Sequence, residues 1–301
     1  MNIALICDNR RWRRKLEPWE EVQSACLRLG HEVCTLNEGG DAKELPGCGN
    51  FDAVFVWNGM KGHFLRWVDA AKKMGATPIY MERGFFDRMK HTQFDIKGFS
   101  YRASWAKDLL SQPPKEAEDK FVKTWGDKVS KYHVRKKGYV LLPMQIFGDA
   151  QLQDAEIKTS AKLALVIQNG PHNLQIMLRP HPRDPGQCGP VLGTNEIQIC
   201  PLNEAINGAK YIITINSNLG HEALASGVPV LCLGPSLYEP VANVATLSNL
   251  TAKITEMEKG WHPEYEDVKN YLYNITTHQF SEDEIEHGNI IESVLNAATT
   301  R

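Results

Sequence analysis

The sequence lacks any apolar run long enough to cross a membrane. No stretch approaches the roughly 20 apolar residues that a bilayer-spanning helix needs. The first apolar run, residues 3–7, follows no basic leader and ends at Asp8, so it predicts a first strand and not a signal peptide. We therefore expect a cytoplasmic protein without a transmembrane segment.

The sequence also lacks the cysteine pairs that mark zinc and redox sites. Its seven cysteines are scattered and form no CxxC pair. Cys7, Cys200 and Cys232 fall in apolar runs, where a thiol behaves as a small hydrophobe. This pattern predicts reduced, structural cysteines, with no metal site and no bound cofactor.

Strong net charge is absent as well, although one basic cluster stands out. The formal net charge is -2 over 301 residues, with 42% hydrophobic and 23% charged residues, as in an ordinary globular protein. Arg10, Arg11, Arg13 and Arg14 lie close together around one tryptophan. Such clusters are most often solvated faces, and they also suit an anionic acceptor such as a lipid-linked glycan or a nucleic acid.

Apolar segments of strand length alternate with helical patterns along the whole chain. We predict strands at residues 2–7, 53–57, 77–81, 139–144, 174–179, 197–200, 211–215 and 228–233. Alternating strands and helices indicate parallel sheets. The predicted fold class is α/β, with two Rossmann-like domains facing a cleft in which ligands bind outside the carboxyl ends of the strands.

One segment interrupts this alternation and predicts a domain boundary. Residues 111–137 contain Pro113-Pro114 and then charged residues with few large aliphatic ones. We therefore place an N-terminal domain with its linker at 1–137 and a C-terminal domain at 138–301. The last predicted helix, about 282–297, is amphipathic and is expected to cross back to the first domain.

The segment 212–234 reads as strand, polar turn, helix and strand. Asn216, Ser217 and Asn218 follow the first strand, where free N–H groups and the helix dipole could hold a phosphate, and Gly220 would allow close approach. The alternative is that these residues only cap a helix.

Three more segments place reactive groups at strand ends. Glu82 follows an apolar strand directly, as a candidate base or nucleophile, or else as a partner of Arg83 or Arg88 in a surface ion pair. Gln145 and Asp149 follow the strand at 139–144, where Asp149 could instead be a helix cap.

The third segment is Arg179-Pro180-His181-Pro182, in which two prolines fix the backbone around a histidine. His181 could donate to a phosphate or act as an acid near neutral pH, with Arg179 as a second cationic contact. The alternative is a histidine in a stiff loop.

These segments together resemble a known family. Glu82 with Gly84-Phe85, then LLPMQIFGDAQL, RPHP and INSNLGHEALASGVPVLCLG, occur in the order found in capsular-polysaccharide type glycosyltransferases related to bacterial β-Kdo transferases. The resemblance covers about residues 77–235, and the joint order of the four motifs is more specific than any one of them.

The resemblance implies a GT-B fold whose N-terminal domain receives the acceptor and whose C-terminal domain holds a nucleotide sugar. It also implies a reaction without metal that retains the anomeric configuration. The implied catalytic residues are Glu82, Asp149 and His181. The implied donor-binding residues are Gln145, Arg179, His181, Asn216, Ser217, Asn218, Gly220 and Glu222, the last on ribose hydroxyls.

The sequence departs from the family pattern in two places. The acidic turn reads Glu82-Arg83 and lacks a second carboxylate, and Asn218 to His221 replace the usual threonine-valine version of the phosphate turn. The donor base, CMP or UDP, therefore stays open. Two alternatives remain: a glycosyltransferase that modifies a hydroxylated base in DNA, and an epimerase or a non-catalytic protein that binds sugar nucleotides.

Overall fold

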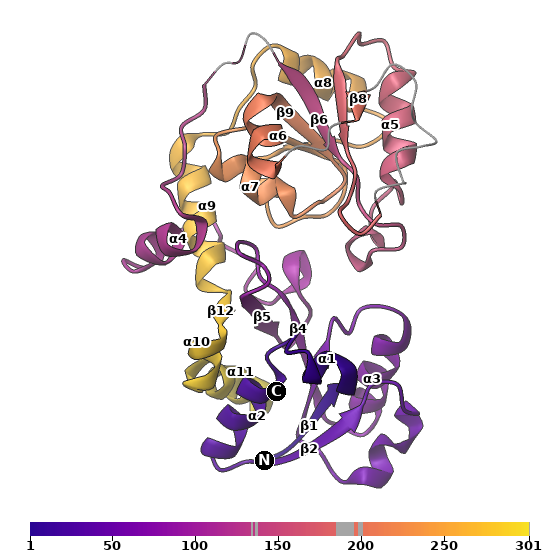
Figure 1. The fold of residues 1–301 in the computed structure, drawn as a ribbon, viewed down its shortest axis with the longest axis vertical. Helices are drawn as coiled ribbons and strands as arrows, with labels where there is room; N and C mark the ends of the chain where they lie inside the picture. Colours follow the sequence, from indigo (N-terminus) through magenta and orange to yellow (C-terminus); the bar gives the residue numbers. More distant parts are fainter. Residues whose placement is uncertain (134, 136–137, 185–195, 198–200, 301) are drawn as a thin grey trace. The chain divides into compact units, whose positions relative to one another are not determined.

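Two α/β units, each built around its own sheet, make up the chain (Figure 1). The structure is a computed structural model that describes residues 1–133, 135, 138–184, 196–197 and 201–300. Unit 1 comprises Met1–Asp108 and Ile275–Arg301, and unit 2 comprises Leu109–Asn274. Each unit is described separately below.

The sheet of unit 1 has six strands in the order β12-β5-β4-β3-β1-β2. Its strands are β1 (Asn2–Cys7), β2 (Glu32–Asn37), β3 (Ala53–Trp57), β4 (Thr77–Arg83), β5 (His91–Asp95) and β12 (Phe280–Ser281). The first four are parallel, whereas β5 and β12 are antiparallel to their neighbours. Every residue of β3 is buried, as expected for a parallel strand covered on both faces.

Helices cover this sheet through regularly spaced apolar residues. They are α1 (Asn9–Arg13), α2 (Trp19–Arg28), α3 (Gly62–Lys73), α10 (Glu282–Glu286) and α11 (Asn289–Thr299). In α2, for example, Trp19, Val22 and Cys26 are buried, a spacing that places them on one face.

The predicted last helix does cross back to the first part of the chain. Ile285, Ile291 and Val294 are buried in one hydrophobic cluster with Trp19 and Phe55. The single helix expected at 282–297 is wrong in detail, because Gly288 has a φ of +89° and separates α10 from α11.

The sheet of unit 2 is parallel throughout, in the order β11-β10-β9-β6-β7-β8. Its strands are β6 (Tyr139–Pro143), β7 (Ile176–Arg179), β8 (Glu196–Ile197), β9 (Ala209–Thr214), β10 (Val230–Cys232) and β11 (Asn243–Val244). Its helices are α4 (Ala117–Trp125), α5 (Ser160–Gln168), α6 (Leu202–Gly208), α7 (Leu219–Ala225), α8 (Leu250–Glu258) and most of α9 (Tyr265–Thr277).

The boundary between the units differs from the predicted division at residue 137. The segment 109–137 belongs to unit 2, because α4 buries Ala117 and Phe121, and the Phe121 ring lies 5.4 Å from the ring of Tyr273 on α9. Asn274 Nδ2 also donates to the carbonyl of Leu109 at 3.0 Å. The segment looked like a linker because Pro113-Pro114 and charged residues dominate its sequence, with few large aliphatic residues.

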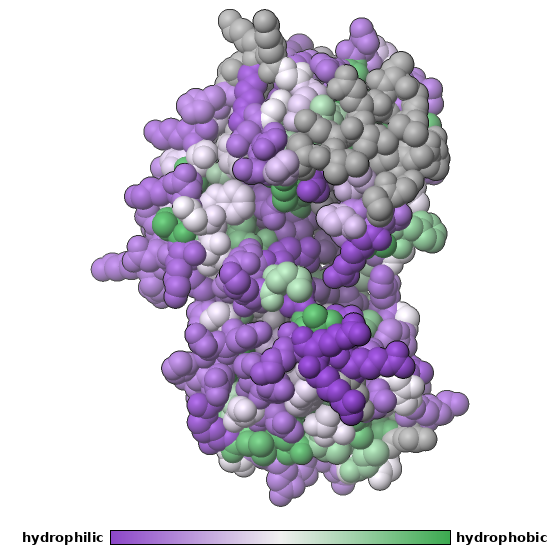
Figure 2. All heavy atoms as spheres, viewed as in Figure 1, coloured by the Kyte–Doolittle hydropathy of each residue, from purple (hydrophilic) through white to green (hydrophobic). Residues whose placement is uncertain are grey.

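The predicted fold class is confirmed, since both units are Rossmann-like α/β sandwiches. Each predicted strand has its counterpart, although residues 198–200 of the sixth lie outside the described part of the chain. No helix among the described residues is long and apolar enough to cross a bilayer. Hydrophilic side chains dominate the face seen in Figure 2.

Candidate functional site

Three of the predicted polar segments meet at one edge of the unit 2 sheet. Gln145, His181 and Asn216 follow β6, β7 and β9, and these strands are adjacent in the order β9-β6-β7. Because the strands are parallel, their carboxyl ends share an edge. The order of strands reverses between β6 and β9, and ligands of open α/β sheets bind outside such a switch point.

Two buried amides join the strands at this switch point. Gln145 Nε2 donates to Asn216 Oδ1 at 3.0 Å, and the backbone N–H of Asn216 donates to Gln145 Oε1 at 3.2 Å. Asn216 Nδ2 also donates to the carbonyls of Gln151, at 2.6 Å, and Pro235, at 3.1 Å. These hydrogen bonds satisfy polar groups that would be costly to bury unpaired. The Gln145–Asn216 pair therefore fills the buried base of this edge with neutral groups.

The turn before α7 uses several of its N–H groups for its own hydrogen bonds. The N–H of Ser217 donates to Thr214 Oγ1, that of Leu219 to Ser217 Oγ, and that of Gly220 to the Ser217 carbonyl. The expectation of free N–H groups is therefore wrong for these three residues. Asn218 is the N-cap residue of α7 but makes no side-chain capping hydrogen bond, and Glu222 is half-buried on the same helix.

Aromatic packing explains the glycine and the histidine of this turn. A Cβ on Gly220 would come within 2.6 Å of the Tyr238 ring, so the close approach that requires glycine is to Tyr238. His221 is buried, lies edge-on to Tyr238, and has Nδ1 2.8 Å from the Tyr271 hydroxyl. His221 was not among the predicted residues. Through its contacts with Tyr238 and Tyr271 it holds the start of α7 in place.

Arg179 and His181 bring positive charge and a donor to this edge. The N–H of Arg183 donates to His181 Nδ1 at 3.1 Å, so the neutral ring carries its proton on Nε2. Arg179 is half-buried, and its Nε is buried with no hydrogen-bond partner among the residues that the structure describes. Arg11 Nε and Trp105 Nε1 are likewise buried with no partner among the described residues, so this feature alone does not mark a ligand site.

In the loop after β6, Asp149 is a helix cap, as in the alternative interpretation of this residue. Asp149 Oδ1 accepts from the N–H of Gln151 at 3.0 Å and begins a short 3₁₀ turn. Two residues earlier, the side chain of Phe147 is 78% exposed. Phe147 escaped the sequence reasoning, although an aromatic residue inside a polar strand-end loop is a signal that could have found it.

Glu82 lies at the end of β4 in unit 1. Its Oε2 accepts from Asn58 Nδ2 at 2.8 Å and its Oε1 from the N–H of Arg83 at 2.9 Å. The guanidinium groups of Arg83 and Arg88 donate instead to backbone carbonyls, Met89 and Leu16 for Arg83 and Gly84 for Arg88. The surface ion pair considered for Glu82 is therefore not formed among the described residues.

The basic cluster is partly consumed within unit 1. Arg11 forms an ion pair with Glu17, whose other carboxylate oxygen accepts from Trp19 Nε1 at 2.8 Å. Burial raises the pKa of Glu17, while the nearby charge of Arg11 lowers it. The predicted acceptor role is thus left to Arg10, Arg13 and Arg14, all of which are exposed.

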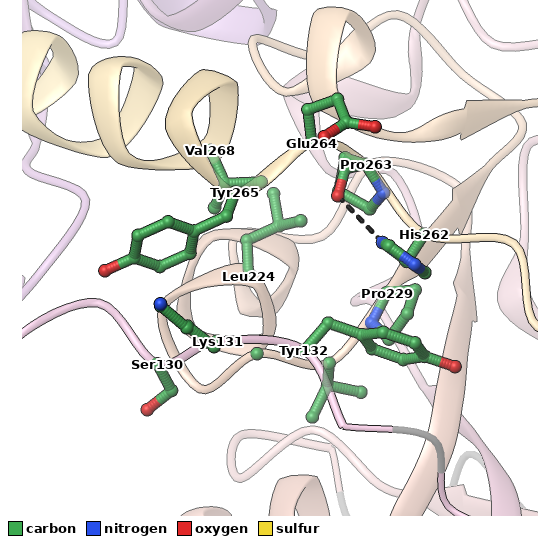
Figure 3. Close-up of a pocket in the computed structure, with 12 residues that line it drawn as sticks. Ser130, Lys131, Tyr132, Leu224, Pro229, His262, Pro263, Glu264, Tyr265 and Val268 are labelled. Carbon is green, nitrogen blue, oxygen red and sulfur yellow. Dashed lines mark hydrogen bonds between the residues drawn. The ribbon is translucent and has the colours of Figure 1, made fainter.

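A separate pocket of about 240 Å³ lies at the opposite, amino-terminal edge of the unit 2 sheet (Figure 3). Leu224 and Val228 are among the residues that line it. In Figure 3, Tyr265 lies on one side and the stacked rings of Tyr132 and His262, 4.3 Å apart, lie on the other. Because Val228 precedes β10, this pocket is distinct from the predicted donor edge.

The described cysteines fit the prediction only in part, because Cys34 is half-buried and Cys48 is exposed. Cys7, Cys26 and Cys232 are buried, and burial raises the pKa of each thiol to about 12. Such thiols remain protonated and unreactive near neutral pH. Cys188 and Cys200 lie outside the described residues.

Two Rossmann-like units with polar strand ends define a two-domain fold of the GT-B kind. The sequence model of the family described as capsule polysaccharide biosynthesis protein matches residues 88–258, more than half of the chain. The chain therefore belongs to this family.

Solved structures share the fold at low sequence identity. One is Thermosulfurimonas dismutans KpsC, β-Kdo 2,7 transferase, with a TM-score of 0.62 and 15% identity over 97% of this chain and 99% of that one. Another is Thermosulfurimonas dismutans KpsC, β-Kdo 2,4 transferase, with a TM-score of 0.60 and 17% identity over 93% and 92%. A search of curated proteins found no match.

Proposed function

We propose that this protein is a glycosyltransferase that moves a sugar from a nucleotide-sugar donor to a glycan or lipid-linked acceptor. Membership of the capsule polysaccharide biosynthesis family supports this proposal. The observation that carries it is the switch-point edge of unit 2, where the half-buried Arg179 and His181 follow one another at the end of β7, next to β6 and β9. A phosphate oxygen could accept from the terminal N–H groups of that guanidinium.

In this proposal, unit 2 holds the donor. Arg179 and the Nε2–H of His181 contact the diphosphate or monophosphate, so two protein groups offset the charge that a metal ion would otherwise balance. Asn218, at the N-cap of α7, contacts the phosphate, and Glu222 on the same helix meets the ribose hydroxyls. Gln145 and Asn216 hold the edge in shape through their mutual hydrogen bonds.

The proposed reaction retains the anomeric configuration through two displacements. A carboxylate, Glu82 or Asp149, attacks the anomeric carbon while the bond to the nucleotide phosphate breaks, and His181 stabilises the leaving phosphate. The acceptor hydroxyl then attacks the anomeric carbon, the bond from that carbon to the carboxylate breaks, and the hydroxyl proton passes to the second carboxylate and from there to water. The carboxylate is regenerated, so the enzyme leaves the cycle unchanged.

A thermal-shift panel of CMP-Kdo and of UDP-, GDP- and dTDP-linked sugars tests the donor assignment. A ligand that binds the native state raises its melting temperature by mass action. We expect one nucleotide class to raise Tm, and Arg179→Met to abolish that rise. The control Arg28→Met removes a basic residue from α2 in unit 1 and should preserve it.

The active donor is then incubated with glycan acceptors with and without EDTA. Product mass and the anomeric coupling in NMR spectra report transfer, metal dependence and stereochemistry. A flat panel with folded protein would contradict the proposal, whereas donor binding followed by epimerised nucleotide sugar would favour the epimerase alternative. Transfer to hydroxylated DNA bases would identify the nucleic-acid alternative.

A further inference from the structure

The carboxylate of Glu82 is held by a side chain from the neighbouring strand end. Asn58 follows β3 and has a φ of +60°, a left-handed conformation that asparagine tolerates better than most residues. Its N–H donates to the Met81 carbonyl at 2.7 Å, and its Oδ1 accepts from the N–H of Met60 at 3.2 Å. The remaining Nδ2 group is thereby aimed at Glu82 Oε2, 2.8 Å away.

The backbone just after Glu82 is held by a residue from the closing segment of the chain. Gln279 is fully buried, and its Oε1 accepts from the N–H groups of Phe85, at 2.7 Å, and Phe86, at 3.0 Å. Its Nε2 donates back to the Phe86 carbonyl at 3.3 Å. One amide thus fixes a turn that precedes it by more than 190 residues in the sequence.

The turn has no room to shift away from this amide. A Cβ on Gly84 would come within 2.8 Å of Gln279 Oε1 and of His91 Cβ, so the chain passes directly over both. Next to Gln279, the His278 ring stacks on Trp105 at 4.2 Å, and Trp105 meets the ring of Phe85 edge-on. Packing on both sides therefore fixes the position of Gln279.

We propose that Asn58 and Gln279 are positioning residues for the Glu82 carboxylate. Asn58 orients the carboxylate itself, and Gln279 fixes the turn from which it projects. This inference rests on the proposed function, in which Glu82 meets the transferred sugar. A misplacement of about 1 Å in a reacting group can lower turnover by about 100-fold, so the fixed geometry has catalytic value.

Two variants remove these contacts, one while keeping the backbone conformation and the other while keeping the side-chain length. Asn58→Gly keeps the left-handed backbone and deletes the amide. Gln279→Met keeps the length of the side chain and deletes its hydrogen bonds. With the donor identified by the panel, we expect each variant to lower kcat by about tenfold and to change the KM for the nucleotide sugar less than about twofold.

Thr77→Val is the matched control. It removes another tie between β4 and the closing segment, the 3.2 Å bond from Thr77 Oγ1 to the Ala298 carbonyl, at the opposite end of the strand. Its kcat should equal that of the wild type. Equal losses of kcat in Thr77→Val and Gln279→Met would reduce Gln279 to a general stabilising role and overturn the proposal.

Amide hydrogen exchange supplies a readout that does not depend on turnover. Gln279→Met should speed exchange at Phe85 and Phe86, whereas Thr77→Val should not. Unchanged exchange would overturn the assignment of Gln279, and if Gln279→Met fails to fold, Asn58→Gly still tests the carboxylate contact.

The variant Glu82→Gln separates failure of this inference from failure of the proposed function. Wild-type turnover in Glu82→Gln would remove Glu82 from the reaction itself. An inactive Glu82→Gln beside fully active Asn58→Gly and Gln279→Met would leave the proposed function standing and overturn only the positioning role.

Discussion

The carboxyl edges of the two sheets differ in the polar groups that they bury. The edge of unit 1 contains buried carboxylates with partners of its own, such as Glu17 with Arg11 and Glu38 with His63, the latter at 3.3 Å. The edge of unit 2 is floored by neutral groups, Gln145 and Asn216. Unit 1 therefore pairs some of its buried carboxylates internally, whereas Arg179, the half-buried cation of the unit 2 edge, forms no ion pair among the described residues.

This difference indicates how the chain could divide its tasks. A buried ion pair must repay the desolvation of both members, so the paired charges of Glu17 and Arg11 contribute to local structure more than to ligand binding. Neutral amides that satisfy each other impose no charge on a ligand. An edge of this kind favours a phosphate that meets Arg179 and His181.

The largest effect is expected from breaking the neutral floor of unit 2. Asn216→Leu would strand Gln145 Nε2 and two backbone carbonyls and should lower the free energy of unfolding by about 3 kcal/mol. Urea unfolding measures it. Asn169→Leu, the same change at an exposed position of the same unit, should cost less than about 0.5 kcal/mol. Equal costs would contradict the role given to the amide pair.

The charged edge of unit 1 is tested by Arg11→Met. Removing the partner of buried Glu17 should cost about 2 kcal/mol, less than for a fully buried pair because the Arg11 side chain is 38% exposed. Thermal unfolding at neutral pH measures this loss.

The same variant makes a prediction about pH. Burial raises the pKa of Glu17 above its ordinary value of 4.5, so the folded state binds the proton more tightly than the unfolded state does. Stability therefore falls as pH rises from 4.5 through the folded pKa. Without Arg11 this pKa rises further, so the fall should be larger and extend to higher pH. Adding Glu17→Gln to Arg11→Met should remove the extra pH dependence of stability. If that pH dependence persists in the double variant, it comes from a group other than Glu17.

On the anion-accepting side, His181→Ala should lower transfer by about tenfold or more and leave Tm unchanged, because the imidazole lies in a half-buried turn outside the core. Steady-state kinetics and thermal unfolding on the same sample measure both quantities. Wild-type turnover would remove His181 from the site.

A smaller effect is expected at Phe147, whose exposed ring is available to stack on the nucleotide base. Stacking of a base on an aromatic side chain is worth about 1 to 3 kcal/mol, and we expect the low end at this open position. Titration calorimetry with the panel donor measures the loss of affinity in Phe147→Ala. Leu165→Ala, which trims an exposed residue of α5, is the control and should bind as the wild type does.

The smallest effect should come from the exposed arginines of unit 1. Replacing Arg10, Arg13 and Arg14 with serine should weaken binding of an anionic acceptor, more at low salt than at 0.15 M, because exposed charges are screened. The donor Kd should not change. If the substitutions do not change acceptor affinity, the cluster is only a solvated surface and does not bind the acceptor.

The eight predicted strands all correspond to parallel strands, whereas the antiparallel strands β5 and β12 and the parallel strands β2 and β11 were not among them. Continuous apolar runs such as residues 53–57 mark buried parallel strands. In contrast, β5 has the polar sequence HTQFD, and β12 has only two residues. The segments β5 and β12 are extended because they pair with neighbouring strands. Their own sequences contain no local pattern that predicts this pairing.

For the candidate site, the sequence determined which residues follow the strand ends, because apolar runs and punctuating prolines are local signals. Only the tertiary structure decided how those residues are used. It paired Gln145 with Asn216, brought Tyr238 against Gly220, and carried Gln279 from the closing segment to the turn after Glu82. These contacts join segments 18 to 194 residues apart, and the spacing of residues along a chain contains no measure of such distances.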